Sequence, residues 1–196
     1  MKREAPKKNF SISLEQFKSD IVKAAKKALK QSTHSIREQF GGRKIVYVGI
    51  HARRGDYAHN PHLTDFYTND NVWRAYFLHC INLFRARIDN ETTKSVFVML
   101  SDEKLWLKNN FENEPDVGFP GYYSLISEER MPARDMYILM LCKHLIRTYG
   151  TFGIWGGFWS KGTVMYSYTG RGFLLYINMC LVVHDYVYDK LYKHML

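Results

Sequence analysis

The sequence is poor in cysteine and has no long apolar run, and each shortage excludes a class of protein. Its three cysteines, Cys80, Cys142 and Cys180, are far apart, so they indicate neither a disulfide framework nor a zinc site. The most apolar stretch, residues 173–183, is too short to span a bilayer. The first eight residues are polar and basic, unlike a signal peptide. We therefore expect the chain as given to be soluble, with no metal site.

Apolar and basic residues are plentiful instead. Hydrophobic residues make up 46% and aromatic residues 15% of the 196 positions, which excludes disorder and allows a sizeable core. The net charge of +9 favours an anionic partner. Nucleic acid is not expected, because the sequence has no zinc spacing, no aromatic RNA-binding signature and no basic heptad region. A basic nucleic-acid-binding protein remains only as a rival interpretation.

An apolar strand runs directly into a cluster of charged residues near position 50. Residues 44–50 have the near-continuous apolar pattern of a parallel strand that is covered on both faces. His51, Arg53, Arg54 and Asp56 follow, and we expect Gly55 to make a turn through backbone angles that other residues avoid. Open α/β sheets bind ligands at the carboxyl ends of such strands, and the fork of arginine donors matches phosphate oxygens. The stretch therefore predicts a phosphate site.

A simpler interpretation of the same residues is an exposed ion pair. Asp56 is close enough in sequence to pair with Arg53 or Arg54, and such pairs contribute little to stability. The choice depends on the rest of the chain.

A second candidate phosphate site is the turn at Gly150-Thr151, between an expected strand at 144–149 and a helix. A helix that begins there presents free backbone N–H groups and the positive end of its dipole. Thr151 can cap that helix and also donate to a phosphate. The alternative is an ordinary turn with a glycine hinge. In a parallel sheet both candidate turns lie at the same edge, so each supports the other.

Strand and helix patterns alternate along the chain with short links, which predicts a doubly wound, parallel, Rossmann-like α/β sheet. We expect three parts: a flexible basic N-terminus at 1–12, an amphipathic helix at 13–42 that begins at Ser13, and the Rossmann-like domain at 43–196. Within the domain we expect strands at 44–50, 95–100, 122–126, 144–149 and 163–168, and helices at 72–88, around Trp106, and at 133–142, 154–160 and 173–196.

Two long motifs resemble those of the galactoside 2-alpha-L-fucosyltransferases, glycosyltransferase family 11. The first is Val48-Gly49-Ile50-His51-Ala52-Arg53-Arg54-Gly55-Asp56-Tyr57. The second runs from Asp135 through Cys142 to Gly150-Thr151-Phe152-Gly153-Ile154-Trp155. They occur in the family's order, and the resemblance covers roughly residues 14–170.

This resemblance implies the C-terminal half of a GT-B type glycosyltransferase that binds GDP-fucose, inverts the anomeric carbon and needs no metal or other cofactor. The helix at 13–42 would then be a remnant of the preceding lobe. The family also implies a galactose-terminated glycan acceptor and a location on the lumenal side of the Golgi membrane, through an anchor that this chain does not contain.

The resemblance also implies roles for individual residues. Arg53 would contact the β-phosphate and take part in catalysis, and Asp56 would be a base, a sugar-positioning group or the partner that orients an arginine. His51 would touch guanosine or ribose, and Asp135 the guanine edge. The rest of the expected donor-binding set is Arg54, Ser101, Asp102, Thr151 and Phe152. Two other interpretations stay open: a non-catalytic fragment that binds a GDP-sugar or glycan, and a protein O- or 1,6-fucosyltransferase.

Overall fold

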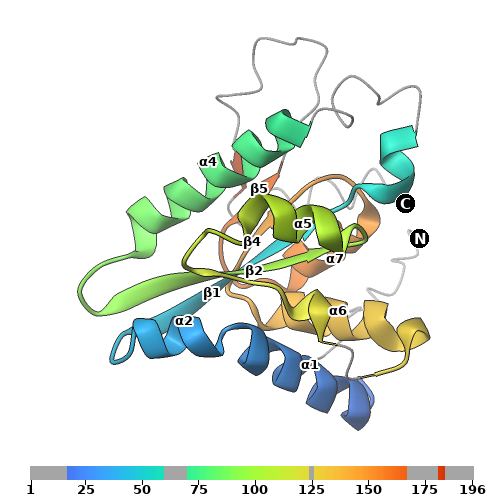
Figure 1. Ribbon diagram of the computed structural model, residues 1–196, viewed down its shortest axis with the longest axis horizontal. Coiled ribbons are helices and arrows are strands. Elements are labelled where there is room, and N and C mark those ends of the chain that lie inside the picture. Colours follow the sequence, from blue (N-terminus) through green and yellow to red (C-terminus); the bar gives the residue numbers. More distant parts are fainter. Residues whose placement is uncertain (1–16, 60–69, 124–125, 167–180, 184–196) are drawn as a thin grey trace, which may run out of the picture.

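The computed structural model describes residues 17–59, 70–123, 126–166 and 181–183, which form a six-stranded sheet with helices on both faces (Figure 1). The strand order is β3-β2-β1-β4-β5-β6. The first five strands pair in parallel and β6 pairs antiparallel with β5. Their bounds are β1 Lys44–Ala52, β2 Thr93–Ser101, β3 Val117–Gly118, β4 His144–Arg147, β5 Val164–Tyr166 and β6 Leu181–Val183.

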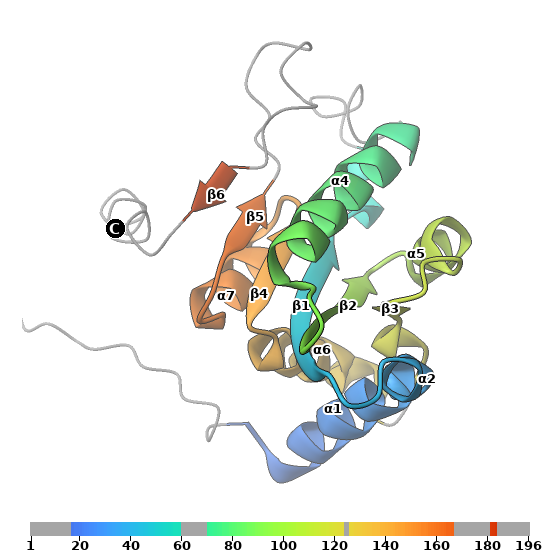
Figure 2. The ribbon, with the colours of Figure 1, turned by 90° about the vertical axis from the view of Figure 1, so that its left-hand side faces the viewer.

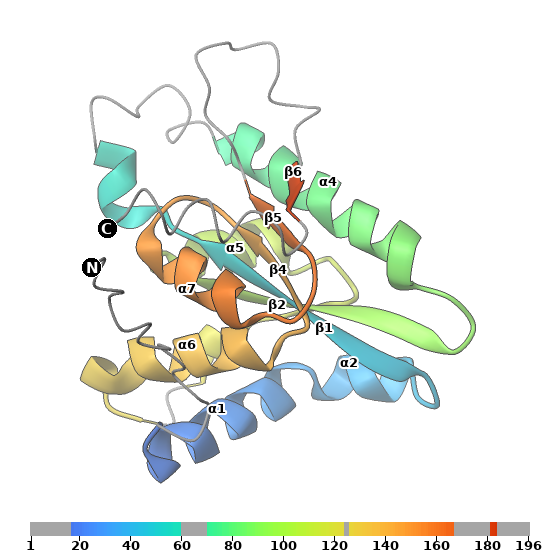
Figure 3. The ribbon, with the colours of Figure 1, turned by 180° about the vertical axis from the view of Figure 1, so that it is seen from behind.

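Two groups of helices cover the two faces of the sheet, so the predicted doubly wound architecture is confirmed. On one face lie α4 (Asp70–Ile88) and α5 (Lys104–Phe111), which bury aromatic side chains such as Trp73, Phe77 and Phe111 against the sheet. On the other face lie α1 (Ser19–Ser32), α6 (Met131–Leu141) and α7 (Thr151–Trp159) (Figures 2 and 3).

The side chains of the central strand β1 are packed on both faces of the sheet. Val48, Ile50 and Ala52 are fully buried in the core beneath α4. Gly49 points to the opposite face, where a Cβ atom would lie only 3.0 Å from Leu145 and 3.1 Å from Leu139. The glycine therefore lets α6 pack closely on the centre of the sheet.

The expected helix at 13–42 is two helices in the described residues. α1 ends at Ser32, and the short α2 (His34–Gln39) follows after Thr33. The Thr33 hydroxyl donates to the Leu29 carbonyl at 2.8 Å, a local bond that competes with continuation of the helix. The expected start at Ser13 lies outside the described residues.

Two predictions about the edges of the sheet were wrong. The strand expected at 122–126 is absent from its described part: Pro120–Tyr122 form a 3₁₀ turn, and the edge strand is instead β3, which pairs with Phe97 and Val98 of β2. Proline has no N–H to donate to a strand ladder, which favours a turn at this point. The helix expected at 173–196 is described only at 181–183, and these residues form β6. None of the described helices is long and apolar enough to cross a membrane.

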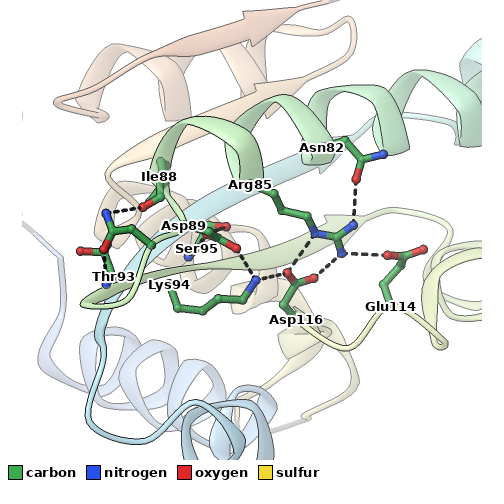
Figure 4. A network of polar contacts seen from close by, with 10 residues as sticks. Asn82, Arg85, Ile88, Asp89, Thr93, Lys94, Ser95, Glu114 and Asp116 are labelled. Atoms are coloured by element: carbon green, nitrogen blue, oxygen red, sulfur yellow. Dashed lines mark hydrogen bonds and ion pairs between the residues drawn. The ribbon is translucent and has the colours of Figure 1, made fainter.

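A buried ion network holds the amino-terminal end of β2 to the end of α4 (Figure 4). Asp116, with 1% of its side chain exposed, accepts bonds from Arg85 at 2.5 and 3.0 Å and from Lys94 at 2.8 Å. Lys94 also pairs with Asp89, whose other oxygen accepts the backbone N–H and the hydroxyl of Ser95. The network lies at the end of the sheet opposite to the motif that follows β1.

We predict that Asp116→Asn lowers the free energy of unfolding by about 2–4 kcal/mol, because it removes the buried charge between two cations. Urea denaturation of the variant and the wild type measures this difference. Glu91→Gln, in the exposed turn before β2, is the control and should change stability by less than about 0.5 kcal/mol. Equal stability of the two variants would contradict the structural role of the network.

Candidate donor-binding site

A cavity of about 530 Å³ lies at the carboxyl-terminal edge of the sheet. It forms at the topological switch point, where β1 has β2 on one side and β4 on the other. The strand register places Ala52 beside Ser101 and His51 beside Arg147. Segments far apart in sequence therefore converge there, as is usual for ligand sites in doubly wound sheets. All the predicted site residues except Arg54 line the cavity: His51, Arg53, Asp56, Ser101, Asp102, Asp135, Thr151 and Phe152.

The guanidinium of Arg53 is fixed by two carboxylates. Its Nη1 donates to Asp102 at 2.8 Å, and its Nη2 donates to Asp56 at 2.6 Å. The backbone N–H of Arg53 donates to the Thr148 hydroxyl at 2.8 Å, which ties the end of β1 to the end of β4. Asp56 therefore makes the orienting contact that the sequence offered as the alternative to a base. A cation held in this way needs little reorganisation when charge develops beside it.

Gly55 is needed for space and not for an unusual backbone angle. Among the described glycines only Gly42 and Gly150 have positive φ, so the turn predicted from the flexibility of Gly55 has a different cause. A Cβ atom at Gly55 would lie 2.4 Å from Asp102 Oδ2. Any side chain here would displace the carboxylate that holds Arg53.

The amino terminus of α7 forms another wall of the cavity. Gly150, with φ of 96°, is the residue before the helix, and no side-chain hydrogen bond caps it. Thr151 is the first helical residue, so the prediction that it caps the helix was wrong. The first N–H groups of an uncapped helix and its dipole attract an anion. Thr151 and Phe152 lie where an anion in the cavity would meet them.

His51 is buried and uncharged at neutral pH. Burial lowers its pKa to about 4; the charge of Asp102 opposes this shift, and those of Arg53 and Arg147 add to it. Its ring packs on Phe152 with centroids 4.9 Å apart. Within the described residues its Nδ1 is buried without a hydrogen-bond partner. A neutral imidazole presents one donor and one acceptor, which suits a polar, uncharged ligand group.

Asp135 lies in the second turn of α6, next to the fully buried Arg134. Burial raises the pKa of this carboxyl group, while Arg134 and Lys104 oppose the shift. Arg134 donates to Asp135 Oδ1 from Nε at 2.8 Å and from Nη2 at 2.5 Å. The carboxylate is thus held in place on the cavity wall, ready to accept further hydrogen bonds.

Arg54 points away from the cavity although it adjoins Arg53 in sequence. Its side chain is 8% exposed and donates to Asp70 at 2.6 Å and to Glu103 at 2.9 Å. Its guanidinium lies 3.9 Å from the ring centre of Trp106. These contacts join β1 to α4 and α5, so the structure gives Arg54 a packing role at the edge of the core.

Several residues that sequence reasoning missed also line the cavity: Tyr57, Lys104, Glu128, Met131 and Pro132. The position of Lys104, two residues after Asp102 at a strand end, was the one available signal. Glu128, Met131 and Pro132 precede or begin α6, and nothing in their local sequence pattern marks them. No group of three metal-binding side chains occurs in the described part of the chain.

Comparison with known proteins identifies the family. The model of glycosyl transferase family 11 matches residues 4–169, so this chain belongs to that family. This match confirms the family that the two motifs indicate.

The chain is similar to particular members over part of their length. Galactoside alpha-(1,2)-fucosyltransferase 2 of Bos taurus is 35% identical over 133 residues, which cover 64% of this chain and 34% of the relative. Galactoside alpha-(1,2)-fucosyltransferase 1 of Sus scrofa is 34% identical over 145 residues, 70% of this chain and 37% of the relative. The chain thus spans about a third of the length of these curated relatives.

Among solved structures, NodZ alpha-1,6-fucosyltransferase soaked with GDP-fucose has a TM-score of 0.50 and 17% identity, covering 86% of this chain and 49% of that one. At this identity the likeness concerns the fold, and it confirms the expected GT-B-like fold.

We predict that His51 titrates near pH 4 and that this titration couples to stability. The folded pKa is lower than that of an unfolded histidine, so the contribution of His51 to stability is complete above about pH 6.5 and is lost as the pH falls through about 4. The loss amounts to at most about 3 kcal/mol. NMR titration of His51 tests the pKa. The pH dependence of unfolding should be weaker in His51→Asn; identical profiles for variant and wild type would refute the coupling.

Proposed function

We propose that this chain is the donor-binding part of an alpha-1,2-fucosyltransferase, which transfers fucose from GDP-fucose to the 2-hydroxyl of a terminal galactoside with inversion. Family membership supports the reaction class, and the names of the relatives support the linkage. The single observation that carries the proposal is the convergence of the fixed Arg53 and the uncapped amino terminus of α7 on one cavity.

That arrangement suits the departure of a nucleoside diphosphate. When the bond between fucose and the β-phosphate breaks, negative charge collects on the leaving phosphate oxygen. In our proposal the Arg53 guanidinium and the backbone at Thr151 and Phe152 stabilise this charge more in the transition state than in the ground state. These cationic and dipolar groups would serve in place of a metal ion, so we propose a reaction that needs no metal cofactor.

The nucleotide base would bind toward α6. An ionised Asp135 accepts two hydrogen bonds from the two neighbouring N–H donors on the guanine edge, a pairing that adenine and uracil cannot reproduce. Arg134 supports this role because it favours the ionised form of a carboxyl group that burial would otherwise neutralise. His51, neutral and packed on Phe152, would contact the guanosine or its ribose.

Asp56, Ser101 and Asp102 would act mainly by positioning. Asp56 and Asp102 hold Arg53, and the Ser101 hydroxyl accepts the Glu103 N–H at 3.0 Å, which shapes the loop after β2. The acceptor hydroxyl must lose a proton late in the reaction, and Asp56, exposed at the cavity wall, is our proposed base in addition to its contact with Arg53.

A non-catalytic GDP-sugar-binding protein is the second candidate function. The chain spans about a third of its relatives' length, and a donor pocket by itself binds without transferring. Transfer of labelled fucose to a galactoside distinguishes the two functions, and comparison of 1,2- with 1,6-linked products tests the linkage. For the transferase we propose the lumenal side of the Golgi membrane as the place of action.

We expect the chain to bind GDP-fucose in calorimetric titration, more tightly than GDP-mannose and much more tightly than UDP-galactose. Arg53→Ala should weaken GDP-fucose binding about 30- to 100-fold, because the charged hydrogen bonds to the phosphate disappear. Arg130→Ala is the matched control: Arg130 is also half-exposed and paired with a carboxylate, Asp20, but does not line the cavity. Equal affinity in the two variants would overturn the site.

We also expect Asp135→Asn to reduce the preference for guanine. The variant keeps the shape of the side chain but presents an amide that cannot accept both guanine donors. GDP affinity should fall at least tenfold while ADP and UDP affinities stay within about twofold, as measured by competition against GDP-fucose. An unchanged ratio of GDP to ADP affinity would place base recognition elsewhere.

A further inference from the structure

The charges that line the cavity do not match the ligand proposed for it. His51 is neutral, and the remaining charged side chains are two cations and four carboxylates, a formal charge of −2. A nucleoside diphosphate sugar is itself a dianion. Repulsion of this size must be offset locally by groups that face the phosphates. The charged residues are Arg53, Asp56, Asp102, Lys104, Glu128 and Asp135.

Arg53 by itself is a weak source of the missing positive charge. Each of its two terminal nitrogens already donates to a carboxylate, Asp102 at 2.8 Å and Asp56 at 2.6 Å. The cluster of these three side chains has a formal charge of −1. The Arg53 guanidinium is well placed, but its two carboxylate partners largely cancel its electric field at a distance.

Lys104, unlike Arg53, is not paired with a nearby carboxylate of the described residues. Among the described residues, no carboxylate oxygen lies within 4.0 Å of its ammonium group. Its stem lies over Gly121, where a Cβ atom would be 3.7 Å from the Lys104 Cγ and Cδ atoms. Its carbonyl accepts the hydroxyl of Tyr122 at 2.8 Å. The backbone and the aliphatic part of Lys104 are therefore held in place, while its ammonium group is available to a ligand in the cavity.

The location of Lys104 is also unfavourable for the helix that carries it. It is the first residue of α5, whose first turn contains no acidic residue. A cation at the positive end of a helix dipole costs stability, and Glu103, which could offset it, pairs with Arg54 instead. Sequences commonly break such local rules at functional positions.

We propose that Lys104 is a second phosphate-binding cation, which binds the diphosphate of the nucleotide sugar from the β2 side of the cavity. This assignment rests on the proposed function, because it needs a nucleoside diphosphate in the cavity. It divides the work between two cations: Arg53 is rigid and aimed at the breaking bond, whereas Lys104 supplies charge through a flexible ammonium group. Together with the amino terminus of α7 it surrounds the diphosphate with positive groups.

The test is calorimetric titration of the full chain with GDP and with guanosine, which has no phosphate. In Lys104→Met we expect GDP affinity to fall about 10- to 30-fold and guanosine affinity to stay within twofold. Lys104→Arg, which keeps the charge, should retain GDP affinity within about threefold. The dependence of GDP affinity on salt concentration should also be weaker in Lys104→Met than in the wild type.

Lys108→Met provides the matched control. Lys108 lies one turn later on α5 and does not line the cavity, so its loss should leave GDP affinity within twofold. If Lys104→Met binds GDP as well as Lys108→Met does, the assignment of Lys104 is overturned while the donor site stands. A parallel loss of guanosine affinity in Lys104→Met would also overturn it, because Lys104 would then act on the base side. Failure of the wild type to bind GDP would overturn the proposed function as well.

Discussion

The carboxylate of Asp102 joins the two strands that make the site. One oxygen accepts the Arg53 side chain at 2.8 Å and the other accepts the Arg54 backbone N–H at 3.0 Å. The bonds fix the chain as it leaves β1, so Arg53 turns into the cavity and Arg54 turns toward the core. They also require a glycine at position 55, where a Cβ would touch the same carboxylate. The geometry of the proposed donor site therefore depends on a side chain that lies 49 residues away from the arginine it holds.

The two ends of the sheet use charge in different ways. At the amino-terminal end Asp116 is buried between Arg85 and Lys94, and each charge there has a close partner. Asp116 is the most deeply buried member and bridges both cations, so its charge contributes to the stability of this end. At the carboxyl-terminal end the groups are more exposed, and four carboxylates line the cavity with two cations, one of which, Lys104, has no close carboxylate partner among the described residues. Unpaired charges of this kind destabilise the protein when no ligand is bound. Binding sites commonly retain such unfavourable local features.

In the proposed function, the donor side and the acceptor side of the reaction depend on different surfaces. The cavity brings together the groups that we propose bind a base and a diphosphate and stabilise the leaving-group charge, and all of them come from one Rossmann-like unit. The linkage is decided by which acceptor hydroxyl is presented to the anomeric carbon. This chain is similar both to relatives named for 1,2-transfer and, in fold, to a neighbour named for 1,6-transfer.

Apolar periodicity and strand-end polarity are local signals, so they predicted the doubly wound sheet, the placement of β1, β2 and β4, and the two turns that form the cavity. The sequence prediction failed at the sheet edges, where 3₁₀ turns and short strands leave weak patterns, and at Thr33, where α1 ends and the hydroxyl bonds back to the Leu29 carbonyl. Local sequence could not predict which of Arg53 and Arg54 lines the cavity. The side chains of neighbouring residues leave a strand in different directions. Arg53 meets Asp102 and Arg54 meets Trp106 because of the elements that fold against the end of β1. The role proposed for Lys104 could not be predicted locally either, because it depends on the position of Lys104 beside α6 and the end of β1.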